Sequence, residues 1–167
     1  MKSSYEVRAQ LFIKKVFPFI KDCEEPEDYM IAINSYNKLH HRKVIVDYGM
    51  TRVVLITSDY VVKIDYGTKS RIWGSCEDEY QMYKQAVQDG FDYLFAKVTP
   101  IVFEDRAFYI MPRIHGIGSL HSGGYDVDEW LTEEENDWVN EHCWDIHEEN
   151  YGWHNNRPVI IDYASRV

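Results

Sequence analysis

The chain has 167 residues, of which 45% are hydrophobic and 15% aromatic, and its formal net charge is −10. This size suits one domain, or two small lobes that share a core, and the apolar content argues against intrinsic disorder. No basic stripe is present to neutralise phosphates, which disfavours general nucleic-acid binding. No run approaches the roughly 18 apolar residues of a membrane span, and residues 1–10 lack the apolar core of a signal peptide.

The acidic residues are concentrated in one segment. Residues 126–150 contain eleven acids and no Lys or Arg, whereas the remainder is nearly neutral. Such a segment is either a solvated helix face or a surface that attracts cations or a basic protein partner. The three cysteines, Cys23, Cys76 and Cys143, are widely spaced and form no CxxC motif. This pattern favours a reducing compartment, and we expect a cytoplasmic protein.

Two helices are predicted before residue 43. Residues 5–21 alternate apolar and basic side chains with helical spacing, and Pro18 is expected to perturb the helix. Residues 22–28 are predicted to form an acidic turn, and residues 29–39 a second helix. Core packing is the role that we expect for both helices.

Extended segments follow these helices. Residues 43–48 and 51–57 are rich in Val and Ile and flank Gly49, which predicts a hairpin, and residues 60–65 form a third strand. Lys63 lies in the middle of this third strand, between Val62 and Ile64. A Lys in that position is unusual unless it faces water or a negatively charged ligand.

The next helix is predicted over residues 76–88, with Glu77 and Glu79 in its first turn and Gly90 after its end. Two further strands are predicted over residues 95–103 and 106–111, and residues 115–124 read as a linker.

A capping box, Thr132 with Glu135, begins a helix that is expected to turn Trp138, Val139 and Cys143 inward. This helix leads to Asp145 in a segment that reads Trp-Asp-Ile-His-Glu-Glu-Asn. Asn150 follows Asp145 by five residues, and Asp162 follows Asn150 by twelve, at the end of the apolar run 159–161.

The pattern D-x-H-x-x-N, followed by about a dozen residues and an apolar-apolar-Asp sequence, resembles the catalytic loop and metal-binding Asp of the protein-kinase-like superfamily. It looks most like the aminoglycoside and choline kinase branch and the short kinase-like proteins of bacteria and phages. The likeness is sharp over residues 145–163 and looser over 44–114. It implies an α+β, minimal kinase-like fold with an antiparallel five-stranded small lobe (43–114) and a truncated helical lobe (115–167). The N-terminal helices (1–42) have no counterpart in the resemblance and are expected to form a third part of the same compact unit.

The resemblance also implies an ATP- and magnesium-dependent phosphotransferase acting on a hydroxyl acceptor that the sequence does not identify. Asp145 would orient or deprotonate the acceptor hydroxyl, and Asn150 and Asp162 would hold magnesium through oxygen ligands. Lys63 would neutralise the α- and β-phosphates, oriented by Glu79, with Glu77 as the substitute.

The segment Met111-Pro112-Arg113-Ile114 would be the hinge, whose backbone binds an adenine edge, with Met111 and Arg113 as the nucleotide-binding residues. The sequence departs from the superfamily in three places. The GxGxxG loop is missing, since only Gly49 lies between the first two strands, and the Asp-Phe-Gly motif is replaced by Asp162-Tyr163-Ala164. Five residues follow Asp162, so we expect no peptide-substrate platform.

Other interpretations of these residues stay open. Asp145 and Asn150 could be helix caps or turn residues. His142, Cys143, His147 and His154 could bind zinc, although none has the usual spacing, and Cys143 could be a nucleophile. The chain could also be a catalytically silent kinase-like protein that modulates a host protein through its acidic surface. Homo-oligomer formation is a further open point.

Overall fold

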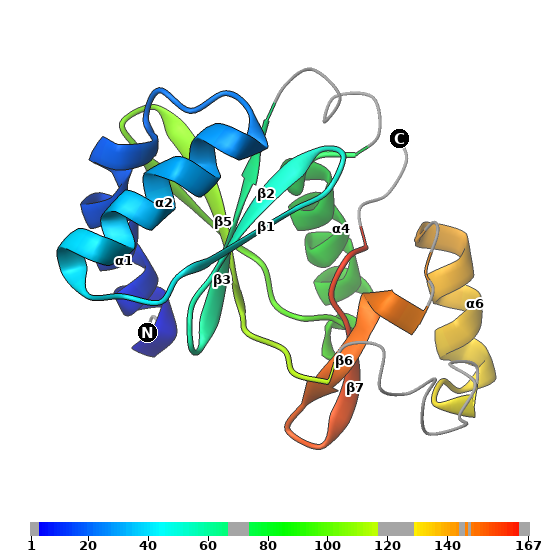
Figure 1. The fold of residues 1–167 in the computed structure, drawn as a ribbon. Helices are drawn as coiled ribbons and strands as arrows, with labels where there is room; N and C mark the ends of the chain where they lie inside the picture. The colour runs from blue at the N-terminus through cyan, green and yellow to red at the C-terminus, as the bar shows by residue number, and fades with distance from the viewer. Residues whose placement is uncertain (1–3, 67–73, 117–128, 144–145, 147, 164–167) are drawn as a thin grey trace. The chain divides into compact units, whose positions relative to one another are not determined.

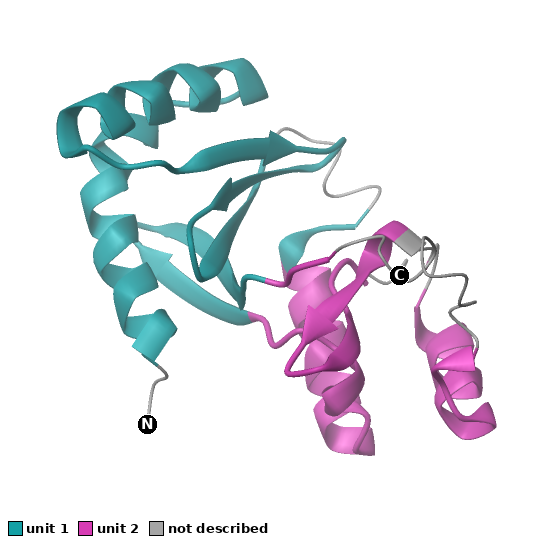
Figure 2. Ribbon diagram, turned by 60° about the horizontal axis from the view of Figure 1, so that its bottom comes forward, with its two compact units in different colours: residues 1–76, 99–113 teal, residues 77–98, 114–167 magenta. Residues whose placement is uncertain are grey.

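The computed structural model describes residues 4–66, 74–116, 129–143, 146 and 148–163. The chain divides into two compact units, coloured separately in Figure 2. Unit 1 comprises residues 1–76 and 99–113, and unit 2 comprises residues 77–98 and 114–167. The predicted α+β class and the antiparallel five-stranded sheet are confirmed, whereas the predicted domain limits stay predictions. Within the described ranges, no helix combines the length and the apolarity needed to cross a membrane.

Unit 1 begins with the two predicted helices, α1 (Ser4–Ile20) and α2 (Pro26–His40). Pro18 lies inside α1 near its end. The prediction that residues 22–28 form a turn is wrong at its second half, because α2 begins at Pro26. Proline suits the first turn of a helix, and the Asp28 carboxylate accepts hydrogen bonds from the backbone N–H groups of Glu24 and Glu25 at 3.1 and 3.0 Å. These bonds satisfy backbone donors at the helix start.

The sheet of unit 1 contains β1 (Ile45–Tyr48), β2 (Arg52–Ile56), β3 (Tyr60–Asp65), β4 (Thr99–Phe103) and β5 (Arg106–Pro112). All neighbouring strands are antiparallel, in the order β1-β2-β3-β5-β4. Figure 1 labels β1, β2, β3 and β5. The β4–β5 turn is tight, because Glu104 and Asp105 both have positive φ angles, of 49° and 63°. A two-residue turn of this kind matches the twist of the strands that it joins.

The predicted strand over residues 95–103 is wrong in its first part. β4 begins only at Thr99, and residues 92–94 form the short 3-10 helix η1 (Asp92–Leu94). The intervening segment pairs elsewhere: Phe95 forms a parallel bridge with Ile160, and the Ala96 N–H donates to the Ile160 carbonyl oxygen at 2.9 Å. The apolar pattern of residues 95–98 did not show whether this segment would extend β4 beside β5 or pair with Ile160.

The core of unit 1 lies between the two N-terminal helices and one face of the sheet. Side chains alternate between the faces of a strand, and every second residue of the central strands packs under α1 and α2. These strand residues are Val53, Leu55, Val62, Ile64, Phe108 and Ile110. The helices contribute Phe12, Ile13, Val16, Ile20, Tyr29, Ile33 and Tyr36. The expectation that both helices serve core packing is confirmed.

Unit 2 contains most of α4 (Cys76–Asp89), together with η1, α6 (Glu133–His142), η3 (Glu148–Asn150), β6 (Tyr151–His154) and β7 (Arg157–Ile160). Gly90 ends α4 as predicted, with a φ of 82° that favours glycine. The capping box of α6 is also confirmed: the Glu135 N–H donates to Thr132 Oγ1 at 3.2 Å, and the Thr132 N–H donates to Glu135 Oε2 at 2.8 Å.

Candidate functional site

A tight hairpin brings Asn150 close to Asp162. Asn155 and Asn156 form the turn between β6 and β7 with φ angles of 51° and 61°, a conformation that Asn adopts more readily than most residues. The register pairs Tyr151 with Ile160, so the residues just outside the hairpin also meet. The strand β6 was missed in the sequence, although Asn-Asn between two short apolar segments is a turn signal.

Two hydrogen bonds close the open end of this hairpin. The Ile161 N–H donates to the Asn150 carbonyl oxygen at 2.8 Å, and Asn150 Nδ2 donates to the Asp162 carbonyl oxygen at 3.2 Å. The Asn150 side chain is buried, whereas Asp162 is exposed. Asn150 and Asp162, twelve positions apart, are therefore held in contact. Both side chains carry oxygens of the type that magnesium binds.

Tyr163 fixes the backbone immediately after Asp162. Its side chain is fully buried, its ring lies edge-on to Phe95 with centroids 4.7 Å apart, and its hydroxyl donates to the Ala96 carbonyl oxygen at 2.7 Å. Burial raises the pKa of Tyr163 well above its usual value, so this hydroxyl stays a donor at neutral pH. The position of Asp162 is thus set from both sides, by Asn150 and by Tyr163.

Glu79 belongs to the same part of unit 2. It lies in the first turn of α4, is fully buried, and accepts a hydrogen bond from the Tyr163 backbone N–H through Oε1 at 3.4 Å. A buried carboxylate is costly unless other groups compensate for its charge. Three of the predicted site residues, Glu79, Asn150 and Asp162, are therefore linked through the backbone of residues 162–163.

The remaining described site residues lie in unit 1. Lys63 is buried, with an exposed fraction of 6%, and pairs with Val54 on β2 and Tyr109 on β5. By strand alternation, Lys63 and Met111 share the sheet face opposite to α1 and α2. Lys63 thus lies on a buried sheet face and does not face open water, and its phosphate-binding role stays a prediction.

Arg113 makes two bonds that bear on its predicted hinge role. Its backbone N–H donates to the Asp59 carbonyl oxygen at 2.9 Å, and its Nη1 donates to the Thr57 carbonyl oxygen at 2.8 Å. Both donors are thus directed at the β2–β3 turn, which Arg113 ties to the end of β5. The backbone N–H that would meet an adenine edge is used by this turn, and the hinge role of Met111 and Arg113 stays a prediction.

Asp145, the predicted catalytic residue, and His147 lie outside the described residues.

The zinc interpretation gains no support from the neighbouring residues that are described. The His142 ring stacks on Trp138, with ring centroids 4.2 Å apart. Burial raises the pKa of the Cys143 thiol to about 12. The nucleophile interpretation is therefore disfavoured as well, because this thiol stays protonated at neutral pH. Within the described ranges, no group of three or more His, Cys, Asp or Glu residues could hold a metal ion.

The acidic helix α6 is anchored to unit 2 by its inward face. Trp138 and Val139 are buried as predicted, and Trp138 Nε1 donates to Asp89 Oδ2 at 2.9 Å. Tyr93 donates to Glu135 Oε1 at 2.6 Å, and this bond is the main cause that raises the pKa of Tyr93 to about 12. The opposite face of the helix exposes four carboxylates, those of Glu133, Glu134, Asp137 and Glu141.

The chain was compared with protein-family models, curated proteins and solved structures, and no significant match was found in any of the three.

Proposed function

We propose that the protein is an ATP- and magnesium-dependent phosphotransferase of kinase-like fold, which transfers the γ-phosphate to a hydroxyl acceptor. One observation carries the proposal: the side chains of Asn150 and Glu79 both form hydrogen bonds with the backbone at Asp162 and Tyr163. Two ligands of one cation must lie close together, and the hairpin between Asn150 and Asp162 supports this role because it brings the two residues into contact.

The order of elements gives independent support. The resemblance implies three strands, a helix with a Glu in its first turns, two further strands, and then the catalytic loop. The chain follows this order as β1, β2, β3, α4, β4 and β5, with Lys63 on the third strand and Glu79 on the helix. In this function Lys63 neutralises the α- and β-phosphates, while Asn150 and Asp162 hold magnesium.

Catalysis would depend on position and electrostatics rather than on covalent chemistry by the protein. Magnesium would neutralise the charge on the phosphates, and the site residues Asn150 and Asp162 supply oxygen ligands for it. Asp145 would orient the acceptor hydroxyl or accept its proton.

Calorimetric titration of ATP, with and without magnesium, tests the proposal. We expect magnesium-dependent binding in the wild type and its loss in Asp162→Ala, because one of two protein ligands is removed. Asp137→Ala, which removes an exposed acid from α6, is the control for lost negative charge. Asp145→Ala is expected to bind ATP but to transfer no phosphate. ATP binding that is equal in the wild type and in Asp162→Ala would refute the site.

The exposed carboxylates of α6 favour a second candidate function, a catalytically silent protein that binds a basic protein partner. A helix face with four exposed carboxylates and no Lys or Arg attracts positively charged surfaces. Replacing Glu133, Glu134, Asp137 and Glu141 by Gln or Asn would then abolish capture of the partner, whereas Lys63→Met would not. Dependence of capture on Lys63 and ATP would argue against this second function.

A further inference from the structure

Unit 1 contains a pocket that none of the predicted site residues lines. It has a volume of about 640 Å³ and lies between the helices α1 and α2, residues 42–44, which connect α2 to β1, and the β2–β3 turn. Pockets of roughly 300–1,000 Å³ are the usual size for small-molecule sites. The volume is far larger than an inorganic phosphate or a carboxylate needs, and it leaves room for an organic body beside an anionic group.

The inner wall of this pocket is aromatic. Phe12, Tyr36 and Tyr60 line it, and their exposed fractions are only 7%, 2% and 6%. Phe12 packs edge-on against both tyrosines, with ring centroids 5.7 Å from Tyr36 and 6.1 Å from Tyr60. Burial raises the pKa of Tyr60 to about 12, so its hydroxyl is neutral in the physiological range. Leu11, half exposed, adds an aliphatic side.

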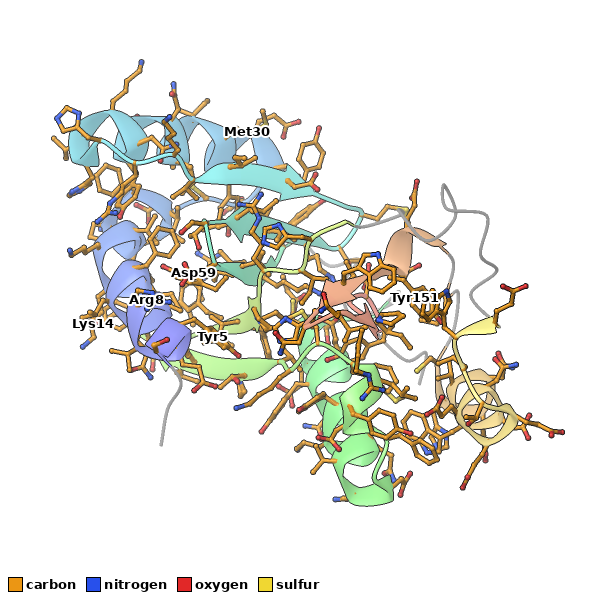
Figure 3. The ribbon with its side chains drawn as sticks, turned by 90° about the horizontal axis from the view of Figure 1, so that it is seen from below. Tyr5, Arg8, Lys14, Met30, Asp59 and Tyr151 are labelled. Carbon is orange, nitrogen blue, oxygen red and sulfur yellow. The ribbon has the colours of Figure 1, made fainter. Side chains whose placement is uncertain are left out.

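The rim of the pocket is strongly cationic, although the whole chain is acidic. Arg8, Lys15, Arg42 and Lys43 line it together with a single acid, Asp59. Arg8 forms an ion pair with Asp59, and Figure 3 shows the two side chains next to each other. No ion pair within the described residues joins the other three cations to a carboxylate. The rim therefore presents about three uncompensated positive charges.

We propose that this pocket binds a small organic phosphate monoester whose body is a planar ring. Arginine and lysine together favour a phosphate dianion, and the aromatic wall favours a ring that can pack against it. Two hydroxyl-bearing residues of the turn, Thr57 and Ser58, also line the pocket.

The pocket is distinct from the proposed ATP site. Phe12, Tyr36 and Tyr60 belong to the core on the helix-covered face of the sheet, whereas Lys63 and Met111 lie on the opposite face of the same sheet. Binding in the pocket is therefore independent of Asp162, and the inference does not rest on the proposed kinase function.

NMR titration of the 15N-labelled protein tests the inference, at constant ionic strength. The probes are phenyl phosphate, adenosine monophosphate, inorganic phosphate and phenol. We expect phenyl phosphate or adenosine monophosphate to give saturable shifts confined to residues of the pocket. Inorganic phosphate lacks the ring, and phenol lacks the phosphate. Each is expected to bind at least about tenfold more weakly than the ring-bearing phosphates, given the usual contribution of charge-assisted hydrogen bonds.

Two double variants identify the cations that matter. Lys15→Gln with Arg42→Gln removes two rim charges and is expected to raise Kd about tenfold or more. Lys14→Gln with Lys38→Gln removes the same charge from exposed positions of α1 and α2 that do not line the pocket, and is expected to leave Kd within about twofold. Figure 3 labels Lys14 on α1.

The proposal is overturned if neither ring-bearing phosphate saturates by 10 mM, a limit on the order of the weakest specific ligands. Equal weakening by the two double variants would also overturn it, because the effect would then be one of general charge. Asp162→Ala should leave Kd unchanged for both ring-bearing probes, and a loss of binding there would assign the probes to the ATP site instead.

Discussion

The Tyr163 hydroxyl offers a direct test of how the chain after β7 is held. Tyr163→Phe removes one oxygen atom and keeps the ring that packs edge-on against Phe95. The Ala96 carbonyl oxygen then loses the hydrogen bond that it accepts at 2.7 Å inside the core. Because Tyr163 is fully buried, water does not replace the lost donor.

An unsatisfied buried acceptor costs about 1–3 kcal/mol. For a chain of this size, each kcal/mol lowers Tm by about 2–4 °C, so Tyr163→Phe is expected to lower Tm by about 2–12 °C. Tyr93→Phe is the matched control, since Tyr93 is 40% exposed and donates to Glu135 at the surface. Water can replace that bond, and the control is expected to cost less than about 1 kcal/mol.

Urea unfolding followed by tryptophan fluorescence measures this difference. Four of the five tryptophans, at positions 130, 138, 144 and 153, belong to unit 2, which also contains Tyr163. The signal therefore reports on the unit that the substitution affects, even if the two units unfold in separate transitions. Equal losses of stability in Tyr163→Phe and Tyr93→Phe would refute the assignment of a buried, structurally important hydrogen bond.

The same substitution has an alkaline signature. Burial raises the pKa of Tyr163 in the folded protein well above its unfolded value, which is about 10. Its contribution to stability is present below pH 10 and is lost as the pH rises above that value, because only the unfolded chain then releases the proton. Above about pH 10, the wild type should lose stability more steeply than Tyr163→Phe.

Three further predictions concern other parts of the chain. Asn37→Ala removes both side-chain bonds that tie the end of α2 to Val44, at 2.8 and 3.0 Å, and is expected to cost about 1–3 kcal/mol in urea unfolding; a loss below 0.5 kcal/mol, roughly the effect of an ordinary surface change, would contradict it. Thr132→Ala removes the N-cap bond to the Glu135 N–H and should cost about 1 kcal/mol, whereas Thr132→Ser should cost little. In the folded protein, Cys23 should react with a thiol reagent before the other two cysteines, because those are buried; simultaneous labelling of all three would disprove their burial.

The sequence by itself determined the elements whose signals are local. The third strand was predicted at residues 60–65, which are the bounds of β3, because its apolar residues end at turn residues on both sides. The capping box of α6 and the glycine after α4 were likewise visible, since both depend on residues within one helical turn.

Only the tertiary structure decided which distant residues meet. The segment 95–98 has a strand-like sequence but pairs at Ile160 rather than continuing β4, a choice that propensity does not make. Glu79 accepts a hydrogen bond from the backbone N–H of Tyr163, the residue after Asp162, across 84 positions of sequence. The cationic pocket is assembled from α1, α2, the segment that connects α2 to β1, and the β2–β3 turn, and its basic residues form no sequence motif. Local backbone preferences fix elements, whereas sites form where packing brings elements together, and that packing depends on the whole core.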